Sequence, residues 1–475
     1  MILRDKLYIN PNEVSQHITQ ICNLFTYSNP EYYAKKKLKL SVYTTPRYIK
    51  HYDFSGNRII IPRGGLQKLC KFLKANNIRL RVVDNRECGY PIDCFLRDTT
   101  LEKQQTDIID ILIKHEGGLI EAPPGAGKTI AMLGLITQLK VSTLILMHEH
   151  RLRTQWESEI QKRVGGNYVL GRLDGDKKED GDIVTAIINS AYTKMQEDPS
   201  YFDKFGMVIV DEAHHVPANS YLTVLNHLPM KYRVGVTGTV ERKDEKHFLL
   251  FDIFGEKLKS IKPSSIKNRI TTFTFEIVNT NIPMELDITR RWTGKQREDV
   301  LDYTKFLGKL VEHRERNLLI LNKAKELIEL GYVPLILSSR IKHLKYLHEY
   351  LTSLEYNSIL LIGENRKKVD WAEIQKDDTI QCICANDKIA SEGLDYPRLS
   401  ALILTCPTSN MPKLIQKIGR IRRVSENKKT PLVVDICDNL AYINANGQRK
   451  YLLRYSTKKR IELYQKLINE YSENM

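Results

Sequence analysis

Apolar and polar positions divide the chain into stretches with different periodicities. From about residue 101 to residue 254, short apolar runs alternate with segments of helical spacing, and a second series of the same kind begins near residue 271. The apolar runs predict short buried strands at 118–120, 143–147, 183–187, 207–210, 233–236, 335–337, 359–361, 379–384, 401–404 and 432–436. Because strands that alternate with helices form parallel sheets covered by those helices, the pattern predicts an α/β fold with two such layers.

The residues before this alternation have a different pattern, which predicts a small α+β module. Its expected elements are helices at 14–25 and 66–74 and strands at 40–44, 58–61 and 78–83. A basic and aromatic run occupies 32–39. At the other end, residues 456–471 have the spacing of a basic amphipathic helix.

These patterns predict a domain organisation. The polar segment at 255–265 carries Lys, Pro and Ser and is the expected linker between the two α/β lobes, whereas 280–302 has no clear periodicity. The expected parts are a small α+β accessory domain at 1–96, a first lobe at 97–258, a second lobe at 259–455 and a C-terminal helix at 456–475.

The composition favours a polyanionic partner inside a cell. The net charge is +16, which favours nucleic acid and, less strongly, an anionic membrane surface. No apolar run approaches the roughly 18 residues of a membrane span, and the first residues lack the apolar core of a secretory signal. We therefore expect a cytoplasmic protein that is not secreted. The eight cysteines form no C-x-x-C pair, so neither zinc nor disulfides are expected, and Cys382 and Cys384 are expected to share a buried strand face.

A glycine-rich turn between a predicted strand and a predicted helix carries the clearest chemistry. The run EAPPGAGKT begins at Glu121. In such a turn backbone N–H groups and the helix dipole converge on one point, which suits a phosphate. Lys128 is expected to reach the β- and γ-phosphates, and Thr129 to bind Mg²⁺. A chance glycine-rich turn is the alternative. The expected nucleotide-binding residues of the loop are Pro124, Gly125, Ala126, Gly127, Lys128 and Thr129.

Two adjacent carboxylates follow another predicted strand. Asp211 and Glu212 end the apolar run 207–210, at the edge where open α/β sheets bind ligands. We expect Asp211 to hold Mg²⁺ and Glu212 to orient and deprotonate the attacking water. The alternative is a solvated loop.

The tetrad Asp-Glu-Ala-His at 211–214 resembles motif II of the superfamily-two helicases, in the DEAH-box group. Further motifs follow in the order of that family, which implies two tandem RecA-like lobes and the use of ATP and Mg²⁺. Gln105 resembles the glutamine that contacts adenine, although Glu102 to Gln104 depart from the usual sequence. The run 148–156 resembles motif Ia, 237–239 motif III with Gly238 for alanine, and 391–395 motif V, whose Gly393 and Asp395 would contact nucleotide. The run 416–423 resembles motif VI.

Motif VI supplies arginines for phosphoryl transfer. By the family pattern Gln416 contacts the nucleotide or its water, Arg420 is a phosphate contact, and Arg423 is the arginine finger. Such a finger is worth roughly 10³ to 10⁵ in rate. A solvated arginine is the alternative at each position. Because Lys128 and Arg423 would act on one γ-phosphate, we expect ATP to close the two lobes and hydrolysis to release them.

Within the superfamily the chain resembles the group that contains XPB and UvsW. Gln155-Trp156 ends motif Ia, and Arg242-Lys243-Asp244 resembles the R-E-D triplet of XPB-like proteins. The resemblance implies a phage or viral type of DNA helicase. It implies 3′-to-5′ translocation and remodelling of forks, D-loops or Holliday junctions in replication, recombination or repair. We expect it to act as a monomer on branched DNA.

Several basic residues are candidate nucleic-acid contacts. In the N-terminal module, tyrosines and basic residues would grip phosphates or stack on a base, or else form a solvated basic face. The candidates are Arg151, Arg242, Lys243, Arg340, Lys35, Lys36 and Lys37. The C-terminal basic helix is expected to pack rather than to bind DNA.

Other functions are compatible with the same pair of ATP-hydrolysing lobes. One is an RNA helicase, and another is the ATPase subunit of a restriction or defence complex. A third is an annealing protein with vestigial hydrolysis, which the intact Lys128, Asp211, Glu212 and Arg423 disfavour.

Overall fold

The structure of the chain is a computed structural model. It describes every residue except 38–39, 124, 176, 217–218, 241–244, 262–269, 282–287, 294–295, 364–373, 375–376, 388, 390–395, 426–427, 444–448, 452 and 473–475. The chain folds into two compact units. The first comprises Met1–Pro123 and Gly127–Ile261, and the second Pro124–Ala126 and Lys262–Met475.

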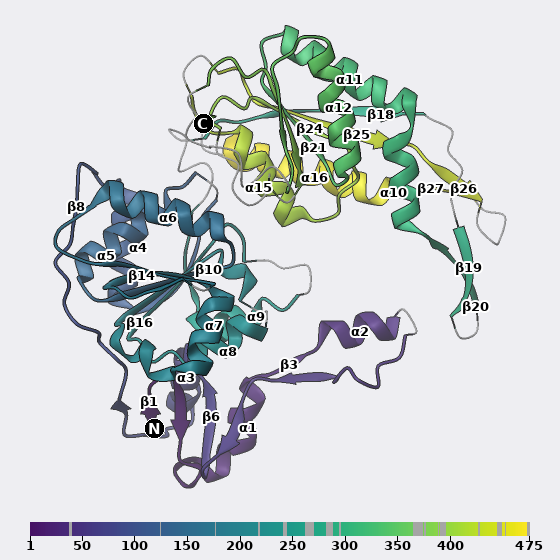
Figure 1. Ribbon diagram of the computed structural model, residues 1–475. Helices are drawn as coiled ribbons and strands as arrows, with labels where there is room; N and C mark the ends of the chain where they lie inside the picture. Colours follow the sequence, from purple (N-terminus) through teal and green to yellow (C-terminus); the bar gives the residue numbers. More distant parts are fainter. Residues whose placement is uncertain are drawn as a thin grey trace. The chain divides into compact units, whose positions relative to one another are not determined.

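The N-terminal module of the first unit is built on a five-stranded sheet in the order β5-β6-β2-β1-β7 (Figure 1). Its strands are β1 (Ile2–Leu3), β2 (Lys6–Ile9), β5 (Asp53–Ser55), β6 (Arg58–Pro62) and β7 (Val83–Asp84). A second, two-stranded sheet pairs β3 (Thr26–Ser28) with β4 (Tyr48–Lys50). The helices are η1 (Pro11–His17), α1 (Ile18–Leu24), α2 (Pro30–Lys37), η2 (Arg63–Gly65) and α3 (Leu66–Ala75).

Two strand predictions in this module are wrong. Residues 40–44 form no strand: the backbone turns there, with the Thr45 N–H bonded to Val42 O at 3.0 Å, and Tyr43 is 96% exposed. In 78–83 only Val83 belongs to a strand, because β7 pairs with just two residues of β1. A segment with alternating apolar residues forms a strand only where a neighbouring strand provides hydrogen-bond partners.

The second part of the first unit is an eight-stranded sheet in the order β13-β12-β14-β10-β15-β16-β9-β17. All neighbours are parallel except β12 and β13. The strands are β9 (Gly117–Glu121), β10 (Thr143–Met147), β12 (Leu170–Asp174), β13 (Lys177–Glu179), β14 (Ile183–Ile187), β15 (Met207–Asp211), β16 (Tyr232–Thr237) and β17 (Lys257–Ser260). A short separate pair joins β8 (Phe95–Leu96) and β11 (Val164–Gly165).

Helices cover both faces of this sheet (Figure 1). One face carries α4 (Lys103–Lys114), α5 (Lys128–Leu139) and α6 (His150–Arg163), and the other carries α7 (Ile188–Glu197), α8 (Asn219–Leu225) and α9 (Phe248–Phe254). The 3₁₀ turns are η3 (Pro199–Lys204) and η4 (Ala213–His215). On β10, Leu144 and Leu146 join the core on the α7 side, as the two-residue period of a strand requires.

The expected linker at 255–265 is partly a strand. Residues Lys257–Ser260 form β17, which pairs in parallel with β9 at the edge of the sheet. The segment was predicted as a linker because it contains lysines and a serine. An edge strand tolerates such polar residues, since only one of its sides is paired with a neighbouring strand.

The second unit has a six-stranded, wholly parallel sheet in the order β18-β25-β24-β21-β23-β22. Its strands are β18 (Thr274–Thr280), β21 (Pro334–Ser338), β22 (Ser358–Leu361), β23 (Cys382–Asn386), β24 (Ala401–Leu404) and β25 (Leu432–Asp438). The predicted strand 379–384 is displaced, because Thr379 and Asp377 form a turn before β23.

Alternation along these strands explains how helices pack on both faces. On β21, Ile336 faces a core with α11 (Arg314–Glu329) and α12 (Ile341–Ser353), together with Cys382 and Cys384, whose shared burial is thus confirmed. Leu335 and Leu337 face the other core, with α15 (Met411–Ile421) and α16 (Arg454–Ser472). The helix α10 (Tyr303–Glu312) precedes α11. The described part of the unit also contains two hairpins: β19 (Ile288–Thr293) with β20 (Gln296–Leu301), and β26 (Ala441–Ile443) with β27 (Arg449–Tyr451).

Candidate nucleotide and nucleic-acid sites

The glycine-rich turn joins β9 to α5, as predicted. Gly125 and Gly127 have φ angles of 86° and 71°, which residues with a Cβ rarely adopt. Gly127 is the N-cap of the helix. Ala122 is fully buried and its N–H donates to Thr237 O at 2.9 Å, so this position still belongs to the sheet and tolerates a methyl group. The turn therefore leads directly into the N-terminus of α5, where the helix dipole favours an anion.

Two predicted side chains lie against this turn. The Lys128 ammonium donates to Ala122 O at 2.8 Å, so it folds back over the loop. Gln105 is 1% exposed, its Oε1 accepts from the Glu102 N–H at 2.9 Å, and its Nε2 donates to Gly127 O at 3.4 Å. Gln105 thus ties α4 to the glycine turn. Thr129 lies in the first turn of α5.

The carboxylates Asp211 and Glu212 lie half-buried at the C-terminal end of β15. Burial and the neighbouring charge of Glu212 raise the pKa of Asp211. Burial would also raise the pKa of Glu212, but its bond to His214 and the charge of Lys128 lower it below the usual range. Two adjacent carboxylates beside one ammonium suit a divalent cation, and Thr129 and Asp211 have the oxygen ligands that Mg²⁺ prefers.

His214 connects this carboxylate pair to the next strand. Its Nδ1 lies 3.2 Å from Glu212 Oε2 and 3.0 Å from Thr237 Oγ1, at the end of β16. Thr237 is itself fixed, since its hydroxyl donates to Thr239 O at 2.9 Å. The motif II and motif III segments are therefore joined by one imidazole.

Trp156 fixes the orientation of Asp211, a contact that the sequence motifs do not reveal. Its indole N–H donates to Asp211 Oδ2 at 2.8 Å, and the Glu212 N–H donates to Asp211 Oδ1 at 2.9 Å. Trp156 is 3% exposed, on the face of α6 that packs against the sheet. Both oxygens of Asp211 are thereby held in place.

We expect Trp156→Phe to raise the Mg²⁺ concentration that half-saturates ATP hydrolysis by about 10- to 100-fold. The phenyl ring fills much of the same space but lacks the N–H, and loss of an outer contact to a metal ligand has an effect of roughly that size. Mg²⁺ titrations of the ATPase, together with Mn²⁺ binding followed by electron paramagnetic resonance in the presence of a non-hydrolysable ATP analogue, measure the change. Equal metal affinity in both proteins would contradict the assignment.

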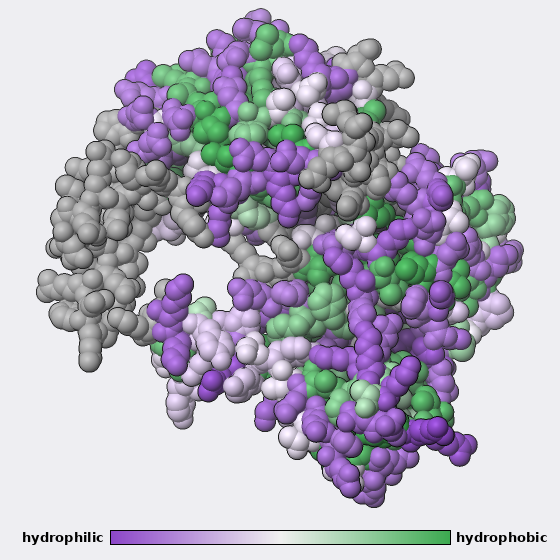
Figure 2. All heavy atoms as spheres, turned by 180° about the vertical axis from the view of Figure 1, so that it is seen from behind, coloured by the Kyte–Doolittle hydropathy of each residue, from purple (hydrophilic) through white to green (hydrophobic). Residues whose placement is uncertain are grey.

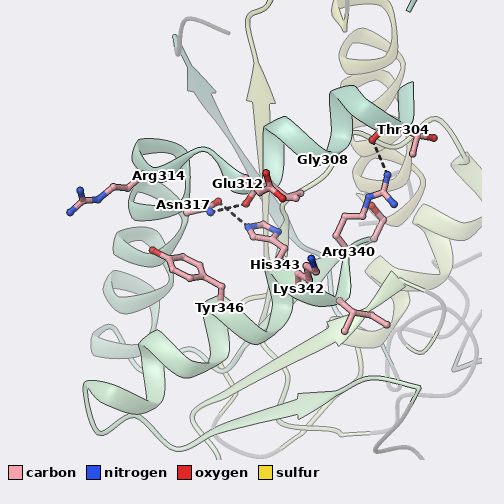
Figure 3. Close-up of a pocket in the computed structure, with 12 residues that line it drawn as sticks. Thr304, Gly308, Glu312, Arg314, Asn317, Arg340, Lys342, His343 and Tyr346 are labelled. Atoms are coloured by element: carbon pink, nitrogen blue, oxygen red, sulfur yellow. Dashed lines mark hydrogen bonds between the residues drawn. The ribbon is translucent and has the colours of Figure 1, made fainter. Parts of the chain in front are cut away.

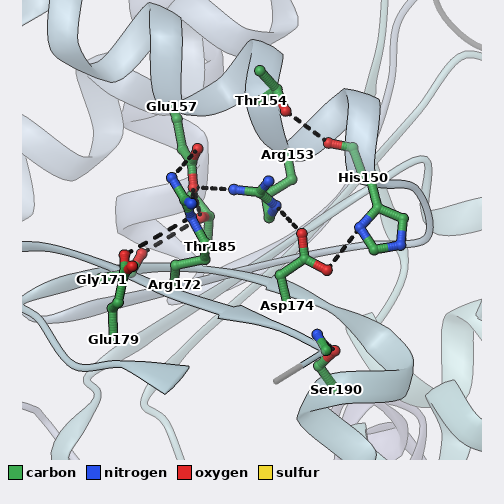
Figure 4. A network of polar contacts seen from close by, with 11 residues as sticks. His150, Arg153, Thr154, Glu157, Gly171, Arg172, Asp174, Glu179, Thr185 and Ser190 are labelled. Atoms are coloured by element: carbon green, nitrogen blue, oxygen red, sulfur yellow. Dashed lines mark hydrogen bonds and ion pairs between the residues drawn. The ribbon is translucent and has the colours of Figure 1, made fainter. Parts of the chain in front are cut away.

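A buried ionic network holds α6 in the position that presents Trp156 (Figure 4). Arg153 Nη1 donates to Glu157 Oε1 at 2.5 Å, and Arg153 Nε lies 2.8 Å from Asp174 Oδ2. Glu157 also accepts from Arg172 Nη2 at 3.0 Å and from Thr185 Oγ1 at 2.8 Å. These bonds connect α6 to β12 and β14.

The second unit carries the motif VI residues on and after α15. Gln416 is buried and Arg420 follows it by one helical turn on the same face. Arg423 lies just beyond the helix, where burial lowers its pKa. Lys428, which the motifs do not include, donates to Arg423 O at 2.7 Å and to Pro397 O at 2.9 Å. Lys428 therefore fixes the backbone that carries Arg423.

Another predicted residue, Arg340, lines a basic pocket of about 920 Å³ in the second unit (Figure 3). Arg314 and Lys342 line it as well, and Arg340 Nη2 donates to Thr304 O at 3.1 Å. The pocket lies where α11 and α12 begin, so two helix N-termini add to its positive potential.

The remaining predicted residues fall on helices or outside the described part of the chain. Arg151 lies in the first turn of α6. Lys36 and Lys37 are exposed on α2, whereas Lys35 is 2.8 Å from Glu31. The candidates that lie outside the described residues are Pro124, Arg242, Lys243, Gly393 and Asp395.

Among the described helices, none combines the length and the apolar character needed to cross a bilayer. On the face shown in Figure 2, hydrophilic and apolar side chains are interspersed.

Comparisons with known proteins identify two matched regions of the chain. Residues 98–242 match the family described as "Type III restriction enzyme, res subunit", and 317–425 match the "Helicase conserved C-terminal domain". A putative ATP-dependent RNA helicase of Acanthamoeba polyphaga mimivirus is 28% identical over 83% of this chain and 74% of its own length. The DNA 3′-5′ translocase XPB2 of Sulfurisphaera tokodaii is 26% identical over 75% of this chain and 86% of its own.

The fold has a counterpart among solved structures. A fragment of a putative HsdR subunit of a type I restriction enzyme from Vibrio vulnificus superposes with a TM-score of 0.52, at 14% identity, over 70% of this chain and 63% of its own. At that identity the likeness concerns the fold alone.

The glycine turn, the paired carboxylates, the two matched regions and the helicase relatives together define a superfamily-two helicase. The chain belongs to this superfamily, and it is similar to viral and phage helicases and to an XPB-type translocase.

Proposed function

We propose that this helicase is an ATP-driven DNA translocase that moves 3′ to 5′ and remodels branched DNA such as forks, D-loops and Holliday junctions. The observation that carries the proposal is its similarity to a DNA 3′-5′ translocase over most of the length of both chains. The excess of positive charge and the basic pocket around Arg340 support a nucleic-acid substrate. The roles that follow from it are replication, recombination or repair.

In this proposal the turn between β9 and α5, together with the end of β15, holds the nucleotide. The glycine turn and Lys128 bind the phosphates, Thr129 and Asp211 hold Mg²⁺, and Glu212 orients the attacking water. When bound, Mg²⁺ neutralises charge on the β- and γ-phosphate oxygens. Gln105 positions the glycine turn through the Gly127 carbonyl.

The second unit supplies arginines to the same reaction. Arg423 stabilises the charge that develops on the γ-phosphate, and Arg420 and Gln416 contact the nucleotide. The N-terminal residues 1–96 serve as an accessory nucleic-acid-binding domain.

An RNA helicase is the second candidate, favoured by the name of the mimivirus relative. A panel of single strands, duplexes, forks and four-way junctions, each made in DNA and in RNA, separates the two candidates. We expect stimulation of ATP hydrolysis and strand separation with branched DNA, and neither in Glu212→Gln. Stimulation by RNA alone would overturn the DNA proposal.

The restriction-subunit alternative is motivated by the family description for 98–242. It predicts that DNA stimulates hydrolysis only in the presence of a second subunit. Stimulation of the purified chain by DNA would therefore exclude it.

A further inference from the structure

Residues 26–50 of the N-terminal module form a projecting arm. The paired strands β3 and β4 are its stem, and α2 lies at its outer end (Figure 1). These residues include five tyrosines and six lysines or arginines but a single acidic residue, Glu31. No residue of α2 is buried. The arm therefore presents aromatic and cationic groups to solvent rather than to a core.

The base of the arm is fixed to the first lobe. The Tyr27 hydroxyl donates to Asp252 Oδ1 at 2.6 Å, and His51 Nδ1 lies 2.7 Å from Asp252 Oδ2. Asp252 is 2% exposed on α9. The Tyr27 ring also stacks on Phe248, with 4.2 Å between ring centroids. An arm anchored in this way holds its outer residues in a defined place.

A pocket of about 880 Å³ lies between α2 and the start of α9. The stacked rings of Tyr27 and Phe248 form part of its lining, with Tyr33 and Lys37 on α2 and Lys246 opposite. Tyr33 is 41% exposed and meets Tyr32 edge-on, at 82° between the ring planes. The exposed part of the Tyr33 ring is available for stacking.

Lysines outnumber carboxylates around the pocket: Lys37 and Lys246 line it with Glu31 and Glu245, and Lys35 and Lys36 lie beside it on α2. Glu31 is the acidic residue of the arm, and it lies 2.8 Å from Lys35 and 3.7 Å from Lys246, so its charge is offset. Lys36 and Lys37 are exposed beside it on α2. Flat aromatic faces next to lysines match a nucleotide, whose base stacks while its phosphate meets the cations. The volume is within the range of ligand pockets, roughly 300 to 1,000 Å³.

We propose that this pocket binds an unpaired nucleotide of the nucleic-acid strand, with the base stacked on Tyr33 and its phosphate beside Lys36 and Lys37. This inference rests on the proposed action on nucleic acid and adds a site outside the helicase motifs. Held there, a displaced strand is kept apart from its complement.

The test uses the full chain and strands that carry 2-aminopurine, as unpaired overhangs on DNA forks and in the RNA counterparts. Stacking on Tyr33 is expected to change the fluorescence of the wild type and of Tyr33→Phe, which keeps the ring. In Tyr33→Ala the change is expected to disappear and overhang affinity to fall by about 5-fold or more. Tyr192→Ala, a 38% exposed tyrosine on α7, is the matched control and should behave like the wild type.

Unchanged fluorescence and affinity in Tyr33→Ala would overturn the proposal. So would weaker binding in Lys36→Ala with Lys37→Ala but not in Tyr33→Ala, because that result means phosphate contact without base stacking. Measuring ATP hydrolysis distinguishes failure of the pocket proposal from failure of the proposed function. If nucleic acid stimulates the wild type but Tyr33 has no effect, only the pocket is wrong. If nucleic acid does not stimulate hydrolysis at all, the proposed function fails.

Discussion

Glu212→Gln is expected to lose ATP hydrolysis by about 10²- to 10⁴-fold while still binding ATP. The amide has the size of the carboxylate but carries no charge to orient and deprotonate the attacking water, and a positioned general base contributes roughly that factor. The low pKa of Glu212 means that the wild-type group is ionised at neutral pH. Lys128→Ala is expected to lose hydrolysis as well, together with nucleotide affinity, because it removes the ammonium that we propose contacts the phosphates.

Phosphate release in the presence of nucleic acid measures the first effect, and binding of a fluorescent ATP analogue measures the second. Asp203→Asn, an exposed carboxylate of the same lobe, serves as the control and should hydrolyse ATP normally. Hydrolysis at the wild-type rate in either Lys128→Ala or Glu212→Gln would refute the site.

Arg460→Met is expected to destabilise the second unit by about 3–5 kcal/mol, the approximate cost of leaving a buried charge without its partner. Arg460 and Asp435 have side chains that are each 1% exposed, with Arg460 Nε donating to Asp435 Oδ2 at 2.6 Å. Although burial disfavours the charge, Asp435 raises the pKa of Arg460 overall. Removing the arginine leaves the Asp435 carboxylate buried with the Tyr464 hydroxyl, at 2.8 Å, and without a compensating charge.

Thermal and chemical unfolding of the full chain, followed by probes in the second unit, measure the loss. Lys458→Met is the matched control, since it lies on the same helix with a side chain that is 76% exposed. Replacing both partners, Asp435→Leu with Arg460→Met, is expected to recover most of the stability. Equal stability of Arg460→Met and Lys458→Met would show that the ion pair contributes nothing.

Most strands of the two lobes were predictable, because a parallel strand buried on both faces is a continuous apolar run. The segments 143–147, 183–187 and 401–404 match β10, β14 and β24 residue for residue. The N-terminal module was not predictable in the same way. Strands such as β1 and β7 have two residues each, which is too short to show an alternation of apolar and polar residues.

The candidate site likewise contains a part that the sequence predicts and a part that it does not. The glycine turn and the Asp211-Glu212 pair are contiguous in sequence, and their chemistry follows from local backbone geometry. Contacts such as Trp156 with Asp211 join residues far apart in the chain. No local pattern distinguishes an indole that only packs from one that also donates to a candidate metal ligand.

The sequence by itself determined the superfamily, the α/β layers and the candidate phosphate-binding and carboxylate residues, because each depends on short segments with their own periodicity or chemistry. Only the tertiary structure decided which side chains hold those residues in place. It paired Arg460 with Asp435, fixed the arm through Asp252, and set Tyr33 beside a pocket. Such pairings arise when distant segments are packed together, and their energies depend on a burial that no single segment encodes.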